Sequence, residues 1–333
     1  MKKTLKISLL FLIFTFLFAF FVPNNTKVVA VSNDQYLGKV QLGGDTIGIQ
    51  IKTKVEIVGK YEVVVEDKKI KPWENSDIKE EDYIYSIDNV IISSNKELNE
   101  AVKSTQKDLL NITLIRDDEL INTTIKVVKN NNGVNTIGLY IKDHLAGIGT
   151  LTFVNVDTNK YGALGHSVSD ALGTGDLYES SIKGVKKAIK GVPGEKFATI
   201  SPNKIGTIES NINIGIFGNY NKPLSNEIVN VVKSENVQEG KAQIVTVIDG
   251  NIIKKFDIEI VEVAKQETTD IKGIKFKVTD SELLENTGGI IQGMSGSPII
   301  QNGNLVGAVS HVIVNQPNYG FGVFAEWMYY QTL

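Results

Sequence analysis

The protein has 333 residues, of which 42% are hydrophobic and 22% are charged, so the chain can bury a core and is neither disordered nor a polytopic membrane protein. Its 35 basic and 38 acidic residues give a net charge of -3, which argues against a general nucleic-acid binder. The absence of cysteine excludes disulfides, a thiolate nucleophile and cysteine-ligated metal centres. Three histidines leave few ways to build a histidine-rich metal site.

The first 30 residues have the features of an export or anchoring segment. Lys2, Lys3 and Lys6 precede an apolar run from Ile7 to Val22, which is slightly short for a membrane span. We favour an uncleaved signal anchor with a tether over residues 1–30; the alternative is a signal peptide whose last residue is Ala30. On either interpretation the basic end stays inside the cell and the remainder is exported.

Residues 31–52 are predicted to be a linker with one strand, because the alternation of Ile47, Ile49 and Ile51 is too short for a domain. Residues 53–128 are predicted to form a small α+β domain. Ser94 and Glu97 have the spacing of a capping box and predict the start of a helix. A strand precedes this helix, and the strands around 112–114 and 121–128 follow it.

This order of strand, acidic turn (81–88), short helix and hairpin resembles a PDZ domain. The resemblance implies that residues 53–128 bind an extended peptide by adding a strand to a sheet edge. The alternative is a spacer domain without a ligand, and no carboxylate-binding loop can be located within 53–128.

The polar stretch from Lys129 to Gly133 predicts a domain boundary, so a second domain is expected over 129–333. Short apolar alternations separated by glycine recur in this region and predict a β-barrel or a sandwich. They lie at 149–153, 199–201, 212–217, 242–248, 258–263 and 274–278.

The strongest chemical signal is Gly-Met-Ser-Gly-Ser-Pro at 293–298. A serine hydroxyl is a weak nucleophile and needs nearby NH groups to stabilise the oxyanion that its attack creates. Glycines beside Ser295 leave those NH groups accessible. The pattern departs from the G-x-S-x-G elbow and matches the nucleophile turn of chymotrypsin-like serine proteases, with an ordinary glycine-serine loop as the alternative.

An Asn302-Gly303 turn after this motif predicts a hairpin. In chymotrypsin-like enzymes such a hairpin leads to the strand that pairs with the substrate backbone. Here that strand would contain Val309, Ser310 and His311, which are therefore candidate substrate-binding residues.

His166 is the candidate general base, because it lies between small residues at a predicted strand end and precedes Ser295, the order of the chymotrypsin group. His144 is interpreted as a surface residue. His311 lies downstream of the serine and is interpreted as a cleft or packing residue.

Four motifs together resemble the stage IV sporulation protein B family of serine endopeptidases: GIGTLTF (147–153), GALGHSVSD (162–170), TGGIIQGMSGSPII (287–300) and GAVSHVIVN (307–315). The family has the same series of parts, an N-terminal anchor, a PDZ-like domain and a chymotrypsin-like peptidase domain. Carried over to this sequence, its nucleophile falls on Ser295 and its base on His166. The expected fold is therefore mainly β, with an anchor, a small α+β PDZ-like domain and a C-terminal β-barrel peptidase domain.

The resemblance favours Asp280 as the residue that orients the histidine, and Asp170, four positions from His166, is the main alternative. The predicted mechanism is attack by Ser295, with His166 as base and the NH groups of Gly293 and Ser295 as oxyanion donors. No metal or organic cofactor is required, and a contact within about 3.5 Å between His166 and Ser295 is expected.

The resemblance also implies a setting, the space between the forespore and mother-cell membranes. There the enzyme would cleave itself and a membrane-bound regulator, which triggers a membrane metalloprotease and mother-cell sigma factor K. The rival hypothesis is a membrane-tethered PDZ scaffold with an inactive peptidase-like domain. A basic cluster of Lys183, Lys186, Lys187, Lys190 and Lys196 is interpreted as a solvated face, with contact to anionic lipid or an acidic substrate as the alternative.

Overall fold

The computed structural model describes residues 35–168, 173–223 and 227–333, and most of these residues lie in β-strands. The fold is therefore mainly β, as predicted. The predicted anchor at 1–30 lies outside the described residues. Within the described ranges, no helix is long and apolar enough to cross a membrane.

Six strands form a first closed ring, in which five junctions are paired strands and the sixth is one bridge between Gly206 and Tyr220. The strands are β2 (Thr46–Lys60), β11 (Leu139–Asn155), β12 (Lys160–Ala163), β16 (Gly215–Asn219), β14 (Glu195–Ile208) and β13 (Gly175–Lys186). A short strand, β15 (Ser210–Ile212), continues β14 along β16. The interior is filled by alternating apolar residues, including Ile47, Leu151 and Leu177.

A second closed ring is built from the C-terminal strands. In pairing order these are β18 (Gly240–Val247), β19 (Ile253–Val263), β20 (Ile274–Val278), β23 (Tyr319–Phe324), β22 (Asn304–Val312) and β21 (Pro298–Gln301), which returns to β18. Asn302 and Gly303 both have positive φ in the β21–β22 turn, which confirms the predicted Asn-Gly hairpin. Phe256, Phe276 and Ile299 are buried inside this ring.

A third group of elements lies beside both rings. It consists of β1 (Tyr36–Leu42), β17 (Ile228–Val232), a 3₁₀ turn (Ser234–Asn236) and α4 (Ala325–Tyr330). β1 pairs with β11 of the first ring and with β17, which forms one bridge to β22 of the second. Phe153, Phe217 and Met328 share a buried cluster there.

The structure changes the prediction for residues 31–52, whose described part is not a linker. β1 and the first half of β2 are paired strands, and Ile47, Ile49 and Ile51 are at most 4% exposed. The short alternation reflects one strand of a closed ring, whose partners come from distant parts of the sequence.

The PDZ-like part carries its own core. Its elements are β3 (Val63–Val65), β4 (Lys68–Ile70), β5 (Tyr83–Ile87), β6 (Val90–Ile91), α2 (Asn95–Ser104), β7 (Leu109–Arg116), β8 (Glu119–Lys126), β9 (Val128–Lys129) and β10 (Asn135–Thr136). The Ser94 side chain accepts a hydrogen bond from the Glu97 NH at 3.2 Å, so the predicted cap forms.

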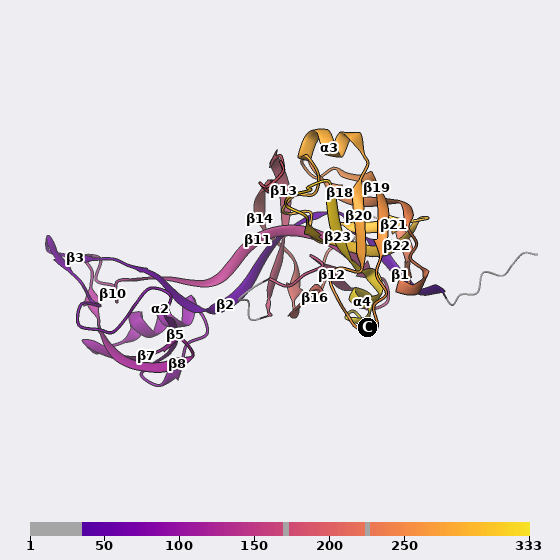
Figure 1. Ribbon diagram of the computed structural model, residues 1–333. Helices are drawn as coiled ribbons and strands as arrows, with labels where there is room; N and C mark the ends of the chain where they lie inside the picture. Colours follow the sequence, from indigo (N-terminus) through magenta and orange to yellow (C-terminus); the bar gives the residue numbers. More distant parts are fainter. Residues whose placement is uncertain (1–34, 169–172, 224–226) are drawn as a thin grey trace, which may run out of the picture. The chain divides into compact units, whose positions relative to one another are not determined.

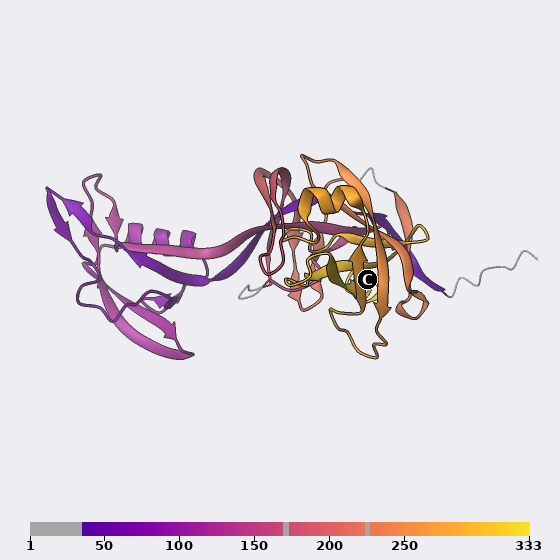
Figure 2. The same cartoon turned by 45° about the horizontal axis from the view of Figure 1, so that its top comes forward.

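The boundary predicted at 129 also differs from the structure, since Ile137 and Leu139 are buried in the core of this part. The polar stretch after Lys129 is the turn of the β9–β10 hairpin. β2 and β11 pair along most of their lengths and lie side by side in both ribbon views (Figure 1, Figure 2), so each strand belongs to the PDZ-like part and to the first ring.

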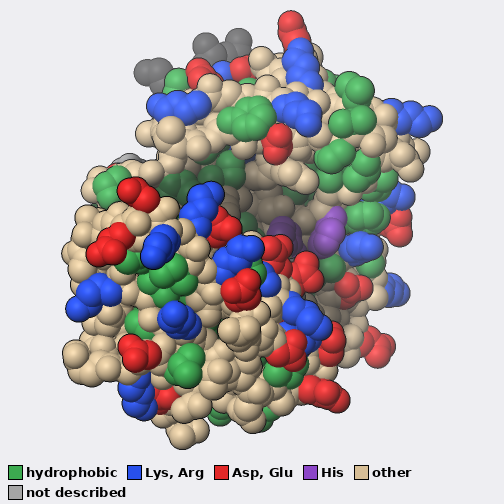
Figure 3. All heavy atoms as spheres, turned by 90° about the vertical axis from the view of Figure 1, so that its left-hand side faces the viewer, with side chains coloured by type: hydrophobic (Ala, Val, Ile, Leu, Met, Phe, Trp, Pro, Cys, Tyr) green, Lys and Arg blue, Asp and Glu red, His purple; other side chains and the backbone are tan. Residues whose placement is uncertain are grey.

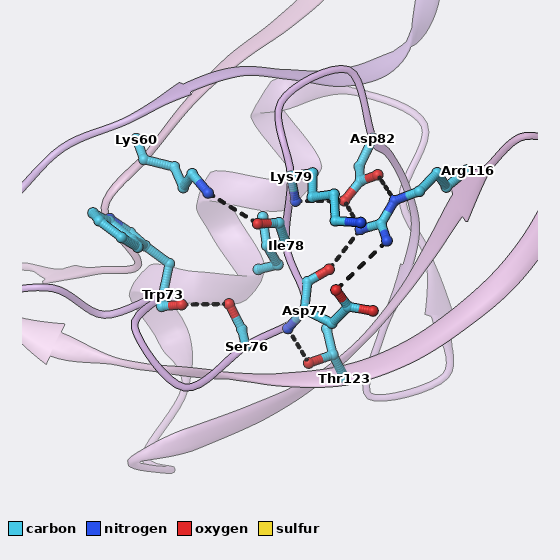
Figure 4. A network of polar contacts seen from close by, with 9 residues as sticks. All are labelled: Lys60, Trp73, Ser76, Asp77, Ile78, Lys79, Asp82, Arg116 and Thr123. Carbon is cyan, nitrogen blue, oxygen red and sulfur yellow. Dashed lines mark hydrogen bonds and ion pairs between the residues drawn. The ribbon is translucent and has the colours of Figure 1, made fainter.

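The acidic turn that suggested a PDZ domain is held by a polar network (Figure 4). Asp82 is 1% exposed and accepts hydrogen bonds from the Arg116 side chain, at 2.6 and 2.8 Å, and from the Lys79 NH at 2.7 Å. Burial raises the pKa of Asp82, but these hydrogen bonds and the Arg116 charge outweigh it and leave the pKa below its ordinary value. The acidic turn is therefore a structural element of this part.

Candidate active site

The loop that carries Ser295 connects α3 (Ser281–Thr287) to β21 and needs glycine at two positions. Gly293 and Gly296 have φ angles of 91° and 90°, a region that other residues rarely adopt. A Cβ atom at Gly296 would lie 2.1 Å from the Thr150 carbonyl oxygen. The glycines that flank Ser295 are thus required by the shape of the loop.

Two threonine hydroxyls on β11 hold this loop by hydrogen bonds. Thr150 Oγ1 donates to the Gly293 carbonyl at 2.9 Å, and Thr152 Oγ1 donates to the Gly296 carbonyl at 2.7 Å. The Thr150 NH also donates to the Ser295 carbonyl at 2.9 Å. Sequence analysis assigned no role to these residues; two threonines at alternate positions of a buried strand were the available signal.

The NH groups of Gly293 and Ser295 have no acceptor among the described residues. Their neighbours do: the Met294 NH donates to Ile291 and the Gly296 NH to Val309. With its carbonyls bonded to β11, the loop leaves the two predicted oxyanion donors free.

His166 follows β12, in the first ring, after a sharp turn in which Leu164 and Gly165 both have positive φ. His166 Nδ1 lies 2.7 Å from the Ser167 carbonyl oxygen. Because a carbonyl can only accept, Nδ1 carries the proton and Nε2 is the acceptor that a general base needs.

Asn211 fixes the backbone after His166. Its side chain accepts a hydrogen bond from the Val168 NH and donates one to the Val168 carbonyl, both at 2.8 Å. This double contact holds the segment whose Ser167 carbonyl orients the imidazole.

His166 and Ser295 line the same cavity, which has a volume of about 660 Å³ and also contains His311. Figure 3 shows histidine side chains, in purple, set back from the surrounding surface. No hydrogen bond joins His166 to Ser295 in the described structure, so the expected direct contact is not formed here. Such catalytic hydrogen bonds are often long before substrate binds.

Much of the cavity wall is apolar. β2 contributes Ile49 and Ile51, and β11 contributes Leu145 and Ile148. The same surface also includes Leu164 and Ile271. Sequence analysis missed these residues, because each is an ordinary strand residue until the ring brings β2 and β11 together.

His311 faces His166 with 5.6 Å between the ring centroids. Burial, followed by the nearby charges of His166 and Lys272, lowers its pKa. His311 Nδ1 is buried without a hydrogen-bond partner in the described structure. The prediction of a cleft residue therefore fits its position.

Of the other two residues predicted to bind substrate, Val309 supports the Ser295 loop and Ser310 is bonded to a different segment. The Val309 carbonyl accepts from the Gly296 NH at 2.7 Å, and the Val309 NH donates to the Ser297 carbonyl at 2.9 Å. Ser310 is 2% exposed and its hydroxyl donates to the Ile271 carbonyl. Of the three predicted residues, only His311 lines the cavity.

The structure does not bring Asp280 to His166. Asp280 is the N-cap of α3: its Oδ1 accepts from the Leu283 NH at 2.9 Å and its Oδ2 from the Asp257 NH at 3.2 Å. It is not among the residues that line the cavity. The alternative, Asp170, lies outside the described residues.

The basic cluster also needs a correction. Four of its five lysines are exposed, as predicted: Lys183, Lys186, Lys187 and Lys190. The fifth, Lys196, is only 5% exposed.

His144 is exposed and bonded to Asp143, which confirms its interpretation as a surface residue. Among the residues described, no group of three or more histidine, aspartate or glutamate side chains could hold a metal ion.

Comparisons with known proteins point in the same direction as the geometry. The family model described as SpoIVB peptidase S55 matches residues 133–329, and a PDZ domain model matches residues 45–127. No curated protein matches the chain.

Among solved structures, the chain is similar to the PDZ domain of an SdrC-like protein from Listeria monocytogenes, with 23% identity, 25% of this chain and 87% of that chain covered, and a TM-score of 0.20. It is also similar to the inactive form of the Rv3671c protease, with 16% identity, 55% and 82% covered, and a TM-score of 0.34. An inactive serine-to-alanine mutant of Rv3671c from M. tuberculosis gives 15% identity, 56% and 81% covered, and a TM-score of 0.32.

Proposed function

The chain belongs to the SpoIVB peptidase S55 family and is a serine endopeptidase; on this premise, we propose that Ser295 is its nucleophile and His166 its general base. The observation that carries the proposal is that the two side chains, from different strand rings, line one cavity beside two backbone NH groups that have no acceptor among the described residues. A contact between base and nucleophile would form when substrate closes the cavity.

In this mechanism the Ser295 hydroxyl attacks a peptide carbonyl while His166 Nε2 takes its proton. The NH groups of Gly293 and Ser295 donate to the oxyanion, and the protonated His166 gives its proton to the leaving amine. Water then releases the acyl group from Ser295 by the same proton transfers. The Ser167 carbonyl holds Nδ1–H throughout, which keeps Nε2 directed at the cavity.

The cavity supports a preference for apolar substrate side chains beside the cleaved bond. Ile49, Leu145 and Ile148 form part of a wall next to Ser295 and His166. Burying one substrate leucine or phenylalanine on such a surface contributes about 1.5–3 kcal/mol.

The proposed setting follows the family. The basic and apolar N-terminal segment supports export with a membrane anchor, and the family supports a role in sporulation. The protein would act in the space between the forespore and mother-cell membranes. It would cleave itself and then a membrane-bound regulator, which activates a membrane metalloprotease and mother-cell sigma factor K.

Substitution of Ser295 tests the catalytic assignment. Wild type is expected to react covalently with a fluorophosphonate probe and to cleave itself, and both activities should be lost in Ser295→Ala. His166→Gln should retain the fold but slow labelling by at least about 10³-fold, because the serine loses its base. The readouts are mass spectrometry of the labelled peptide and gel analysis of the fragments.

Ser167→Ala is the matched control, since Ser167 also lines the cavity but contributes its backbone carbonyl to His166. Its labelling rate should stay within a few-fold of wild type. Equal labelling of wild type and Ser295→Ala would disprove the assignment and favour an inactive peptidase-like scaffold.

A further inference from the structure

Lys196, near the start of β14, carries a buried amine. Its side chain is 5% exposed, and Nζ donates a hydrogen bond to Thr246 Oγ1 at 2.8 Å. Thr246 is itself fully buried. No carboxylate in the described part of the chain forms an ion pair with Lys196. An amine in such a site is strongly disfavoured in its charged form.

The same lysine packs against the loop that carries Gly293 and Ser295, which we call the oxyanion loop. Its backbone NH donates to the Gln292 carbonyl at 3.0 Å, and the Gln292 NH donates back to the Gly194 carbonyl at 2.9 Å. A Cβ atom placed on Gly293 would lie 3.1 Å from Lys196 Cδ and 3.2 Å from its Cβ. The lysine stem thus lies directly against the glycine whose NH is a proposed oxyanion donor.

The surroundings offer the ammonium little compensation. β18 contributes the Thr246 hydroxyl, β11 contributes Ile148 beside Gly293, and the loop contributes backbone. Lys254, the register partner of Thr246 on β19, is bonded to Glu282. Glu195 alternates with Lys196 along β14 and so points to the opposite face. Burial is the single cause that lowers the pKa of Lys196, to about 7.

We propose that Lys196 is a positioning residue that makes the oxyanion loop sensitive to pH. In its neutral form the amine stays in the core and its stem holds Gly293 in place. When the amine is protonated, the buried cation draws in water and loosens the Gln292–Gly293 segment that covers it. This inference rests on the proposed role of Gly293 and Ser295, and it requires a neutral Lys196 in addition to the neutral His166 that a general base must be.

The rate of fluorophosphonate labelling of Ser295 between pH 5.5 and 9 tests the proposal in the full chain. In wild type the rate should fall on the acid side with a slope approaching two protons. In Lys196→Met, which keeps the stem but cannot be charged, the slope should be one. The ratio of the labelling rate at pH 6 to the rate at pH 8 should be about tenfold higher in Lys196→Met than in wild type.

Two further variants separate positioning from a purely structural role. Lys196→Arg keeps the charge at every pH and should label slowly even at pH 8, whereas the exposed Lys190→Met should match wild type. A profile for folded Lys196→Met that has the slope of wild type would overturn the proposal. Continued labelling of Ser295→Ala would instead refute the catalytic assignment, so the two failures are distinguishable.

Direct titration of the Lys196 amine by NMR in wild type keeps the test independent of how the variants fold. Titration near pH 7 would support the proposal, and titration above about pH 9 would overturn it. The pH dependence of the free energy of unfolding provides a second check. Because the pKa of Lys196 is about 7 in the folded chain and about 10.5 in the unfolded chain, the free energy of unfolding should rise with pH between these values. Lys196→Met should lack this rise.

Discussion

At the scale of single residues, the orientation of His166 depends on a backbone carbonyl and an asparagine. Ser167 provides the acceptor for Nδ1–H, and Asn211 holds the next residue, Val168, by two hydrogen bonds. No carboxylate contacts His166 among the described residues. Among the described residues, the partner of His166 Nδ1 is therefore the Ser167 carbonyl.

Asn211→Leu is expected to reduce kcat by about 30-fold with little change in KM, because it removes two hydrogen bonds worth about 1 kcal/mol each without a change in side-chain shape. Asn213→Leu is the matched control: Asn213 lines the same cavity but, within the described residues, makes no hydrogen bond to the segment 166–168. Steady-state cleavage of a peptide substrate measures both. Equal effects of the two substitutions would contradict the role of Asn211.

At the scale of secondary structure, α3 leads directly into the loop of Ser295, and Asp280 caps its first turn. Asp280→Ala should lower the free energy of unfolding by about 1 kcal/mol and reduce activity through the loop, whereas Asp280→Asn should restore both, since asparagine caps helices equally well. Thermal unfolding and the labelling rate of Ser295 distinguish the cases. A loss of about 10⁴-fold in a stable Asp280→Asn variant would show instead that Asp280 orients His166 in the catalytic triad.

At the scale of the whole molecule, the PDZ-like part is an insertion between two strands of the peptidase. Lys52 on β2 and His144 on β11 are register partners, so an Asn-Gly turn in place of residues 53–143 should close the first ring as a hairpin. The shortened protein is expected to fold and to label Ser295 within a few-fold of the wild-type rate, but to cleave protein substrates more slowly. Circular dichroism and labelling check this. An insoluble product, or a folded product that is not labelled, would show that the peptidase needs its insertion.

The sequence alone was sufficient where the chemistry is local. The glycine-framed Ser295, the Asn302-Gly303 hairpin and the Ser94 cap each depend on a few consecutive residues, and the structure contains the turns and the cap they predict. The family resemblance was also carried by short local motifs. His166 was a candidate by its chain order relative to Ser295.

Only the tertiary structure decided which distant residues meet. Ring closure made strands of residues expected to be a linker, placed the isoleucines of β2 in the cavity and buried Lys196 beneath Gly293. It also placed Asp280 at a helix end instead of at the base. The physical reason is that residue type and spacing determine local conformation, whereas burial and partners in a closed β-structure depend on pairing between strands far apart in the chain.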